Sequence, residues 1–167
     1  MTLAISETDL QALVADDPVP QPRATLAWTA VVDIAPRRDL GMGALGERWI
    51  VPILGGRFWG GPGHEALRGR VLPGGADRQL LRADGIKLLR AEYELETEDG
   101  AVITVDNRVL IDDAVQPVRY ALSHLHVTAP AGPHAWLNRR IFAGTLQVLR
   151  PRREAVLVRG YLLDLAA

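Results

Sequence analysis

The sequence predicts an all-β protein that folds as a closed antiparallel β-barrel of about eight to ten strands. Segments of roughly five to ten β-prone residues recur along the chain, with turns between them. The 167 residues include 16 glycines and 11 prolines, which favour many turns and therefore many short strands. Two pairs, Asp84-Gly85 and Asp99-Gly100, are typical of two-residue β-hairpins. Such a meander suits a closed barrel or a sandwich, and a barrel of about eight strands can enclose one small ligand.

The N-terminal segment differs from the rest of the chain. Residues 6–9 resemble the start of a capped helix, and apolar residues at helical spacing follow them. Residues 16–22 contain three prolines, each of which pushes its predecessor toward extended geometry, so a linker is expected there. We therefore predict an appendage over residues 1–23, a short helix or extended arm, and a barrel domain over residues 24–167.

The expected strands share β-prone composition and bounding turns. They are residues 26–34, 49–54, 65–72, 79–82, 86–97, 101–111, 118–128, 139–149 and 154–165. Pro52 indicates an edge or bulge position, and Gly55-Gly56 is interpreted as a turn into residues 57–59. In the long segment 86–97, alternate residues such as Tyr93 share one apolar face, while charged residues occupy the other.

Composition excludes several classes of function. The chain has 19 Lys and Arg against 20 Asp and Glu, which gives no positive excess for binding nucleic acid or anionic membranes. No apolar run approaches the roughly 20 residues of a membrane helix and no signal peptide is visible, so we expect a cytoplasmic protein. The absence of cysteine excludes disulfides, thiolate metal sites and cysteine nucleophiles. Lys87 is the only lysine beside 18 arginines, which we interpret first as genomic base composition.

Two motif-like features carry no expected chemistry. Residues 41–46 spell GxGxxG, but a dinucleotide site needs a helix directly after the glycines, and residues 48–53 are typical of a strand. We therefore interpret residues 41–46 as a loose, flexible connection between strands and predict no organic cofactor. Serine occurs only at Ser6 and Ser123, and no Gly-x-Ser-x-Gly elbow is present, which argues against serine hydrolase chemistry.

Five blocks of sequence carry a resemblance to a known family. They are Gly-Glu-Arg at 46–48, Ile-Leu-Gly-Gly-Arg-Phe-Trp-Gly at 53–60, Gly-Arg-Val-Leu-Pro-Gly-Gly-Ala-Asp at 69–77, Asp-Gly-Ala at 99–101 and Trp-Leu-Asn-Arg-Arg-Ile-Phe-Ala-Gly at 136–144. From about Leu26 to Asp164 the chain resembles the domain-of-unknown-function family 3237, small bacterial and fungal proteins. The resemblance implies a calycin-like barrel, often dimeric, with no generally established activity. We therefore expect a homodimer.

Departures from the family pattern lie at polar positions. The family usually has Asp-Trp-Gln where this chain has Asp-Arg-Gln at 77–79, and it tends to have arginine before the tyrosine at 93. A Tyr-Phe-Arg-Thr-like stretch is replaced by Tyr-Ala-Leu-Ser at 120–123. The glycine scaffold is intact, so we expect the same fold around a specialised pocket.

His124 and His126 are the leading candidates for proton transfer. They lie two apart on a predicted strand and therefore share a face with Tyr120. An imidazole with a pKa near about 6.5 could exchange protons near neutral pH. A His-x-His pair can also bind metal, but the only nearby third ligand is His134, so we predict no metal site. Structural or exposed histidines are the remaining alternative.

Further candidates come from polar residues and aromatics in the predicted strands and turns. Asn107 alternates with apolar neighbours, so its amide should face the apolar side and need a partner. Asp77 either accepts backbone N–H groups in a turn or presents a carboxylate at the barrel rim. The predicted catalytic set is His124, His126, Tyr120 and Asp77. The predicted substrate-binding set is Trp59, Tyr93, Asn107, Trp136 and Asn138.

These candidates favour a cofactor-independent enzyme of the isomerase, cyclase or lyase type. It would hold a small, largely apolar or aromatic metabolite in the barrel and use side-chain acid–base chemistry. The first alternative is a non-catalytic barrel that binds a hydrophobic ligand. A cupin-like metal enzyme using His124 and His126 is the second, and a structural dimer module with the N-terminal helix as docking arm is the third.

Overall fold

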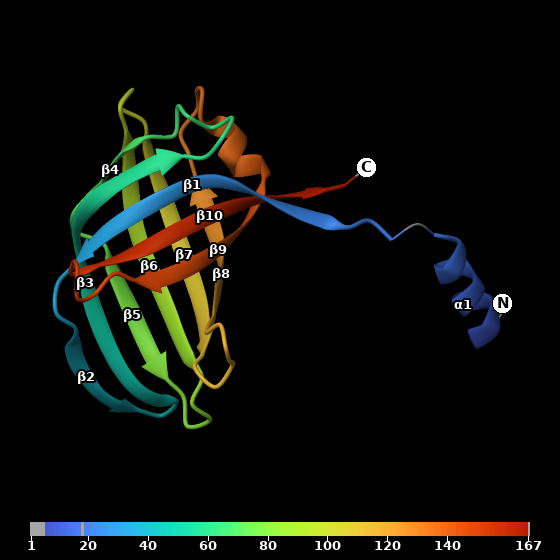
Figure 1. Cartoon of the computed structure of the whole chain (residues 1–167), viewed down its shortest axis with the longest axis horizontal. Coiled ribbons are helices and arrows are strands. Elements are labelled where there is room, and N and C mark those ends of the chain that lie inside the picture. Colours follow the sequence, from blue (N-terminus) through green and yellow to red (C-terminus); the bar gives the residue numbers. More distant parts are fainter. Residues whose placement is uncertain (1–5, 18, 167) are drawn as a thin grey trace.

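A computed structural model describes residues 6–17 and 19–166. Its strands form one antiparallel sheet in the order β1-β10-β9-β8-β7-β6-β4-β3-β2, with β5 also between β3 and β6. Pairing of β1 with β3 closes the sheet into a barrel, in which β4 and β5 share one position and β2 lies outside the ring (Figure 1). The predicted closed antiparallel barrel is therefore confirmed.

The elements of the described chain follow each other with short connections. They are α1 (Glu7–Asp16), β1 (Pro22–Ile34), β2 (Arg38–Gly43), β3 (Gly46–Gly60), β4 (Gly69–Val71), β5 (Ala76–Leu81), β6 (Lys87–Thr97), β7 (Val102–Asp112), β8 (Tyr120–Thr128), the 3-10 helix η1 (Ala135–Arg139), β9 (Ile141–Val148) and β10 (Ala155–Leu165). Both Asp-Gly pairs lie in hairpin connections, as predicted, but each connection is a three-residue loop and not a two-residue turn, since the N–H groups of Arg82 and Thr97 bond the carbonyls of Ile86 and Ala101. Only the glycine of each pair has positive φ, 86° at Gly85 and 87° at Gly100.

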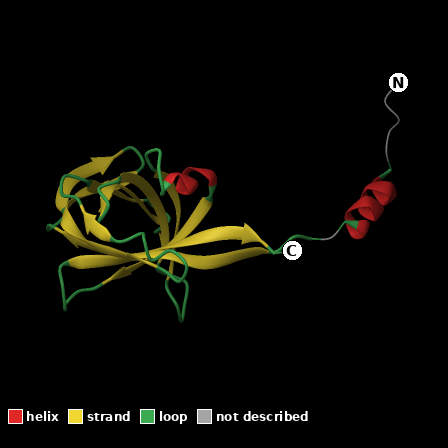
Figure 2. Ribbon diagram, turned by 90° about the horizontal axis from the view of Figure 1, so that it is seen from above, coloured by secondary structure: helices red, strands yellow, loops and turns green. Residues whose placement is uncertain are grey.

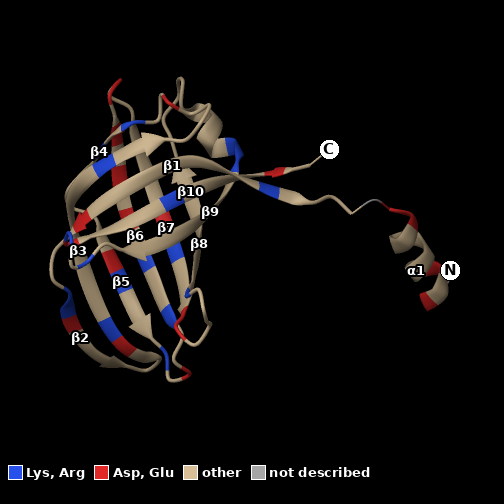
Figure 3. Ribbon diagram, in the orientation of Figure 1, with Lys and Arg blue, Asp and Glu red and all other residues tan. Residues whose placement is uncertain are grey.

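The predicted N-terminal helix is present as α1. Ser6 caps it through a reciprocal pair of hydrogen bonds. The Ser6 hydroxyl accepts a hydrogen bond from the Asp9 N–H at 3.2 Å, and the Asp9 carboxylate accepts one from the Ser6 N–H. The helix buries no residue and lies away from the barrel, and its first turn is acidic with no basic residue in its last (Figure 3). Pro18 of the predicted linker lies outside the described residues, as do residues 1–5 and Ala167. The domain boundary stays a prediction.

Strands β1 and β10 are the longest-range pair in the barrel. They pair from Pro22↔Leu165 to Asp33↔Ala155, and their outer ends project beyond the barrel as a two-stranded ribbon (Figure 2). Within the barrel, β1 pairs with β10 along one side and with β3 along the other. This double pairing leaves β1 without a free edge over its inner half.

Three local expectations were wrong, each for a physical reason. Gly55-Gly56 is not a turn between strands, because β3 runs through it with both glycines at positive φ. A Cβ on Gly56 would lie 2.0 Å from the Val31 carbonyl oxygen, so the close approach of β1 explains the glycine. The GxGxxG stretch forms the end of β2 and a tight turn, not a loose connection. The expected strand 65–72 contracts to β4.

The two ends of the barrel are built differently. At one end η1 and the loop 61–68 cover the interior (Figure 1). Leu67 and Leu137 of this cover belong to the buried hydrophobic core. His64 and Trp136 stack across this cover with ring centres 4.9 Å apart. The opposite end contains the β5–β6 and β7–β8 connections and has no such cover among the described residues. We call these the covered end and the open end.

Candidate functional site

A cavity of about 200 Å³ occupies the barrel interior toward the open end. Its wall is mostly aliphatic, and the exposed side chains of Arg37, Arg119 and Arg150 line it where it reaches the surface. Its full lining is Val32, Ile34, Arg37, Val51, Ile53, Asp77, Gln79, Lys87, Leu89, Ala91, Tyr93, Asn107, Val109, Ile111, Arg119, Leu146, Val148, Arg150, Val156 and Val158.

Strand register arranges the polar lining residues in layers. Lys87 lies opposite Ile111 at the open end, and two residues further along β6 Leu89 lies opposite Gln79. The next layer is Asp77–Ala91–Asn107 across three neighbouring strands, and Tyr93 follows below it. Each step of two residues is about 7 Å along a strand, and alternate residues keep to the inner face. The side chains therefore run from a basic mouth to a neutral and acidic interior.

Three polar atoms in the deep layers are buried and have no hydrogen-bond partner among the residues that the structure describes. They are Asp77 Oδ1, Tyr93 OH and Asn107 Oδ1, and all three residues line the cavity. A buried polar atom without a partner costs about 1–3 kcal/mol, so native proteins rarely keep one without a reason. A small cavity lined by three such atoms is a place where a bound molecule can supply the missing partners.

The Asp77 carboxyl has the properties of a proton-transfer group. Burial raises its pKa above the usual range for aspartate, and a hydrogen bond from Gln79 Nε2 at 2.6 Å and the charge of Lys87 oppose this only in part. Gln79 orients one carboxylate oxygen and leaves the other facing the cavity. Burial likewise raises the pKa of the Tyr93 hydroxyl, which keeps it protonated as a hydrogen-bond donor.

Lys87 and three arginines make the mouth basic. Lys87 is half-buried, and burial lowers its pKa, with the neighbouring Arg37 acting in the same direction. Arg119 pairs with Asp113, and Arg150 pairs with Glu154 at 2.8 Å. None of these four residues is among the site residues predicted from the sequence. One signal was available: the chain's only lysine has the same strand parity as Tyr93.

The structure places the predicted acid–base pair outside the cavity. His124, His126 and Tyr120 lie on the outer face of β8 and are exposed, because Leu125 and its alternate neighbours take the inner face. The three residues do share one face, as the spacing predicted, but that face points to the surface. Their predicted role in a cavity reaction therefore has no geometric basis.

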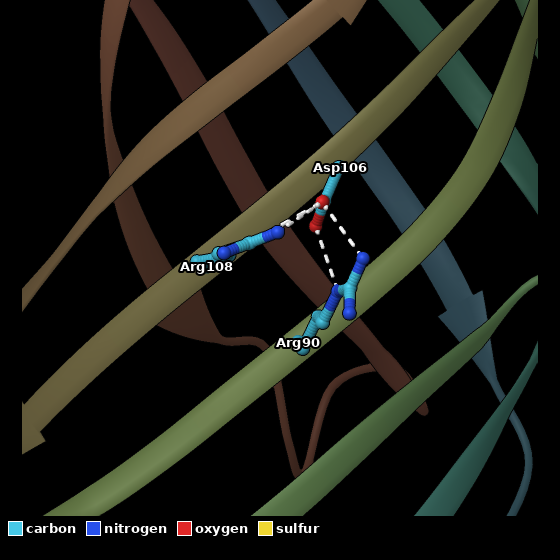
Figure 4. A network of polar contacts seen from close by, with 3 residues as sticks. All are labelled: Arg90, Asp106 and Arg108. Atoms are coloured by element: carbon cyan, nitrogen blue, oxygen red, sulfur yellow. Dashed lines mark hydrogen bonds and ion pairs between the residues drawn. The ribbon is translucent and has the colours of Figure 1, made fainter.

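The outer face beside His124 and His126 is an ion-pair network. Arg90 binds the Asp106 carboxylate through two hydrogen bonds of 3.2 and 3.1 Å, and Arg108 binds it at 3.0 Å (Figure 4). Burial would raise the pKa of Asp106, but the hydrogen bonds from both arginines outweigh it and lower the pKa. Within residues 6–17 and 19–166, no three His, Cys, Asp or Glu side chains group as a metal site would require.

The remaining predicted residues divide between the cavity and the covered end. Tyr93 and Asn107 line the cavity as expected. Trp59 is on the outside, 48% exposed. Trp136 packs on the covered end, and the Asn138 amide bonds the backbone N–H and C=O of Ala129 at 2.8 and 2.9 Å. Neither Trp136 nor Asn138 lines the cavity, because η1 belongs to the cover of the other end and not to the cavity wall.

Sequence comparison relates the chain to one family and to curated bacterial proteins. A family model described as "Protein of unknown function (DUF3237)" matches residues 22–163. A UPF0311 protein of Rhodopseudomonas palustris is 43% identical over 75 residues, which is 45% of this chain and 44% of that protein. A UPF0311 protein of Clostridium acetobutylicum is 36% identical over 78 residues, 45% of this chain and 47% of that protein. The matched part is thus a little under half the length of these relatives.

Solved structures share the barrel. A conserved protein of unknown function from Rhodopseudomonas palustris superposes with a TM-score of 0.75 at 26% identity, covering 89% of this chain and 100% of the other. A β-barrel-like protein from Acinetobacter baumannii gives 0.74 at 27%, covering 89% and 99%. A structure described as an enzyme from Penicillium herquei gives 0.68 at 21%, covering 89% and 98%, and this likeness shows the fold alone. In the part of the chain that the structure describes, no helix is long and apolar enough to cross a membrane.

Proposed function

The chain belongs to the DUF3237 family of proteins of unknown function, and we propose that it is an acid–base enzyme whose substrate occupies the barrel cavity. One observation carries the proposal: three unpartnered polar atoms, on Asp77, Tyr93 and Asn107, meet in one small apolar cavity. The reaction is an isomerisation, cyclisation or elimination, and Asp77 takes the role that the sequence analysis gave to the histidines.

The proposed chemistry follows from the three groups. The free oxygen of Asp77 removes a proton from a carbon next to a carbonyl, and the electron pair of the broken C–H bond moves to the carbonyl oxygen. The Tyr93 hydroxyl donates a hydrogen bond to the enolate oxygen that forms. Asn107 Oδ1 accepts a hydrogen bond from a substrate hydroxyl and so fixes the orientation of the substrate in the cavity. Asp77 then returns the proton to another atom, so the step is redox-neutral.

The size and wall of the cavity limit the substrate. An engineered apolar cavity of about 150 Å³ binds benzene, so about 200 Å³ suits one ring with small substituents. Valine and isoleucine dominate the wall, and branched side chains with few rotamers keep its shape fixed. The substrate is therefore a small, largely apolar or aromatic metabolite with one or two oxygen functions.

The proposal is tested by proton exchange with neutral ketones in D₂O. Cyclohexenone and acetophenone are incubated with the protein, and deuterium incorporation is followed by NMR. We expect wild-type protein to accelerate exchange and Asp77→Asn to lose about 100-fold, the usual contribution of a general base. Arg78→Gln, next to Asp77 on β5 but exposed, is the matched control and should keep the rate. The double variant His124→Ala/His126→Ala should keep it as well.

The same experiment separates the second candidate, a non-catalytic binding protein. The aliphatic wall favours that candidate, because it binds apolar ligands whether or not Asp77 transfers protons. Probe compounds that raise the melting temperature without any exchange above the uncatalysed rate would establish it and refute the enzyme.

Assembly and location remain proposals. We retain the homodimer that the family resemblance implies, and static light scattering of the full chain tests it. The cytoplasmic location is retained on the sequence alone, and fractionation of expressing cells tests it.

A further inference from the structure

Two cations at the cavity mouth, Arg37 and Lys87, have no carboxylate partner in the part of the chain that the structure describes. The Arg37 guanidinium carbon lies 4.7 Å from the centre of the Trp49 ring, and Lys87 Nζ lies 5.8 Å from the same point. Both residues line the cavity. Neither forms an ion pair or a side-chain hydrogen bond within the described chain. The ring attracts both cations without neutralising either, because it carries only a quadrupole.

The mouth has an excess of positive charge. Arg119 and Arg150 are balanced by Asp113 and Glu154. Arg37 and Lys87 then face only one further carboxyl of the cavity, that of Asp77. One positive charge is left when Asp77 is ionised and two when it is protonated. A ligand with a single negative charge restores the balance.

Geometry links this charge to the inner cavity. Lys87 and Ala91 are four residues apart on β6, roughly 13 Å along a strand, and part of this distance is spanned by the lysine side chain. The remainder accommodates one ring and a short linker between the mouth and the layer of Asp77 and Asn107. Arginine suits a carboxylate at such a point, since its fork of N–H donors matches the two oxygens.

We propose that Arg37 and Lys87 form a subsite for a carboxylate carried by the ligand, whose apolar ring extends inward to Asp77 and Asn107. The subsite rests on the proposed function in placing the ligand in the same cavity. It goes further by naming the ligand class: small aryl carboxylic acids with a short linker, bound with the carboxylate at the mouth. Burial and the charge of Arg37 both lower the pKa of Lys87, so an anion at this point also relieves a repulsion.

Calorimetry with cinnamate and its neutral isostere cinnamamide tests the subsite. Wild-type protein should bind cinnamate at least about tenfold more tightly, as expected for charge-assisted hydrogen bonds. Arg37→Gln and Lys87→Met should each reduce this preference, and the double variant should abolish it while keeping the affinity for cinnamamide. Arg78→Gln, a cation on the exposed face of β5, should keep the full preference.

The outcomes separate the two proposals. Equal affinity for acid and amide, no binding of either to folded protein, or phosphate binding as tightly as cinnamate would each overturn the carboxylate subsite. The exchange assay uses neutral ketones, so loss of the subsite leaves the role of Asp77 standing. If the cinnamate preference follows Arg37 and Lys87 but Asp77→Asn keeps the exchange rate, the subsite stands and the acid–base function fails.

Discussion

The covered and open ends of the barrel both bury polar side chains, but they treat them differently. At the covered end, His134 Nε2 lies 3.1 Å from the Asp99 carboxylate, and Asn138 bonds both polar groups of Ala129. The exception at this end is the indole N–H of Trp28, which is buried without a hydrogen-bond partner among the described residues. In the cavity toward the open end, the buried atoms of Asp77, Tyr93 and Asn107 have no partner among the described residues, and outside the cavity Ser123 Oγ on β8 has none either.

If the proposed function is right, this difference separates polar groups that hold the structure together from those that bind the ligand. A polar side chain whose bonds are all made within the chain fixes a loop or a cover. A buried polar group without a partner makes the folded state less stable, and where it lines a cavity a bound molecule can supply the missing hydrogen bond. Substitutions in the cavity should therefore change the exchange rate, and substitutions at the covered end should change the free energy of unfolding. Three experiments test this difference.

The largest effect is expected at Tyr93. Tyr93→Phe removes the donor to the enolate oxygen, and exchange of cyclohexenone in D₂O should slow by about 100-fold, as for loss of one oxyanion donor. Because the hydroxyl has no partner in the free protein, urea unfolding should show no loss of stability. A variant that exchanges normally but unfolds at lower urea would show that the hydroxyl is structural.

An intermediate effect of the opposite kind is expected at Asn138. Asn138→Ala leaves the backbone N–H and C=O of Ala129 without partners, which should lower the free energy of unfolding by about 2 kcal/mol. Exchange per folded molecule should be unchanged. Urea titration and the exchange assay on the same sample measure both quantities, and an activity loss larger than the unfolded fraction would contradict the division.

The smallest effect is expected in the pH dependence of stability, to which the carboxyls of Asp77 and Asp99 should contribute with opposite sign. The folded-state pKa of Asp77 is raised by burial, so its contribution to stability is present below its ordinary pKa and is lost as pH rises through the raised value. The pKa of Asp99 is lowered, first by a hydrogen bond from Thr97 and then by His134, so its contribution is present above the ordinary pKa and is lost as pH falls. Urea unfolding from pH 3 to 8, with Asp77→Asn and Asp99→Asn against wild type, should give differences of opposite slope. Parallel slopes would count against the assignment.

Much of the fold could be predicted because its signals are local. The Asp-Gly turns, the alternation along 86–97 and the capped start of α1 each depend on a few neighbouring residues. Gly55 and Gly56 could not be interpreted correctly, since their positive φ serves a strand that β1 approaches closely. That approach is a tertiary property that no local pattern contains.

The candidate site was predictable only in part, because alternation gives the parity of a strand but not which face is inward. In β8 both faces carry apolar residues, with Leu122 outside and Leu125 inside. The sequence therefore does not show which face is inward, and the prediction that His124 and His126 point into the barrel is wrong. In β7 the charged residues mark the outer face, and Asn107 was placed correctly. Lys87 lies an even number of residues from Tyr93 and therefore on the same inner face of β6. It was not predicted as a cavity residue because it is the first residue of the strand.

Pairing of β1 with β10 has a consequence for the kinetics of folding. The paired residues are far apart in sequence, from Asp33 with Ala155 to Pro22 with Leu165. Contacts of such separation raise the contact order and slow folding, because the chain loses loop entropy before the pairing compensates for it. During synthesis β1 can pair with β3 early, but its other edge must wait for β10, so the wall around the cavity is completed only after the last strand has been made.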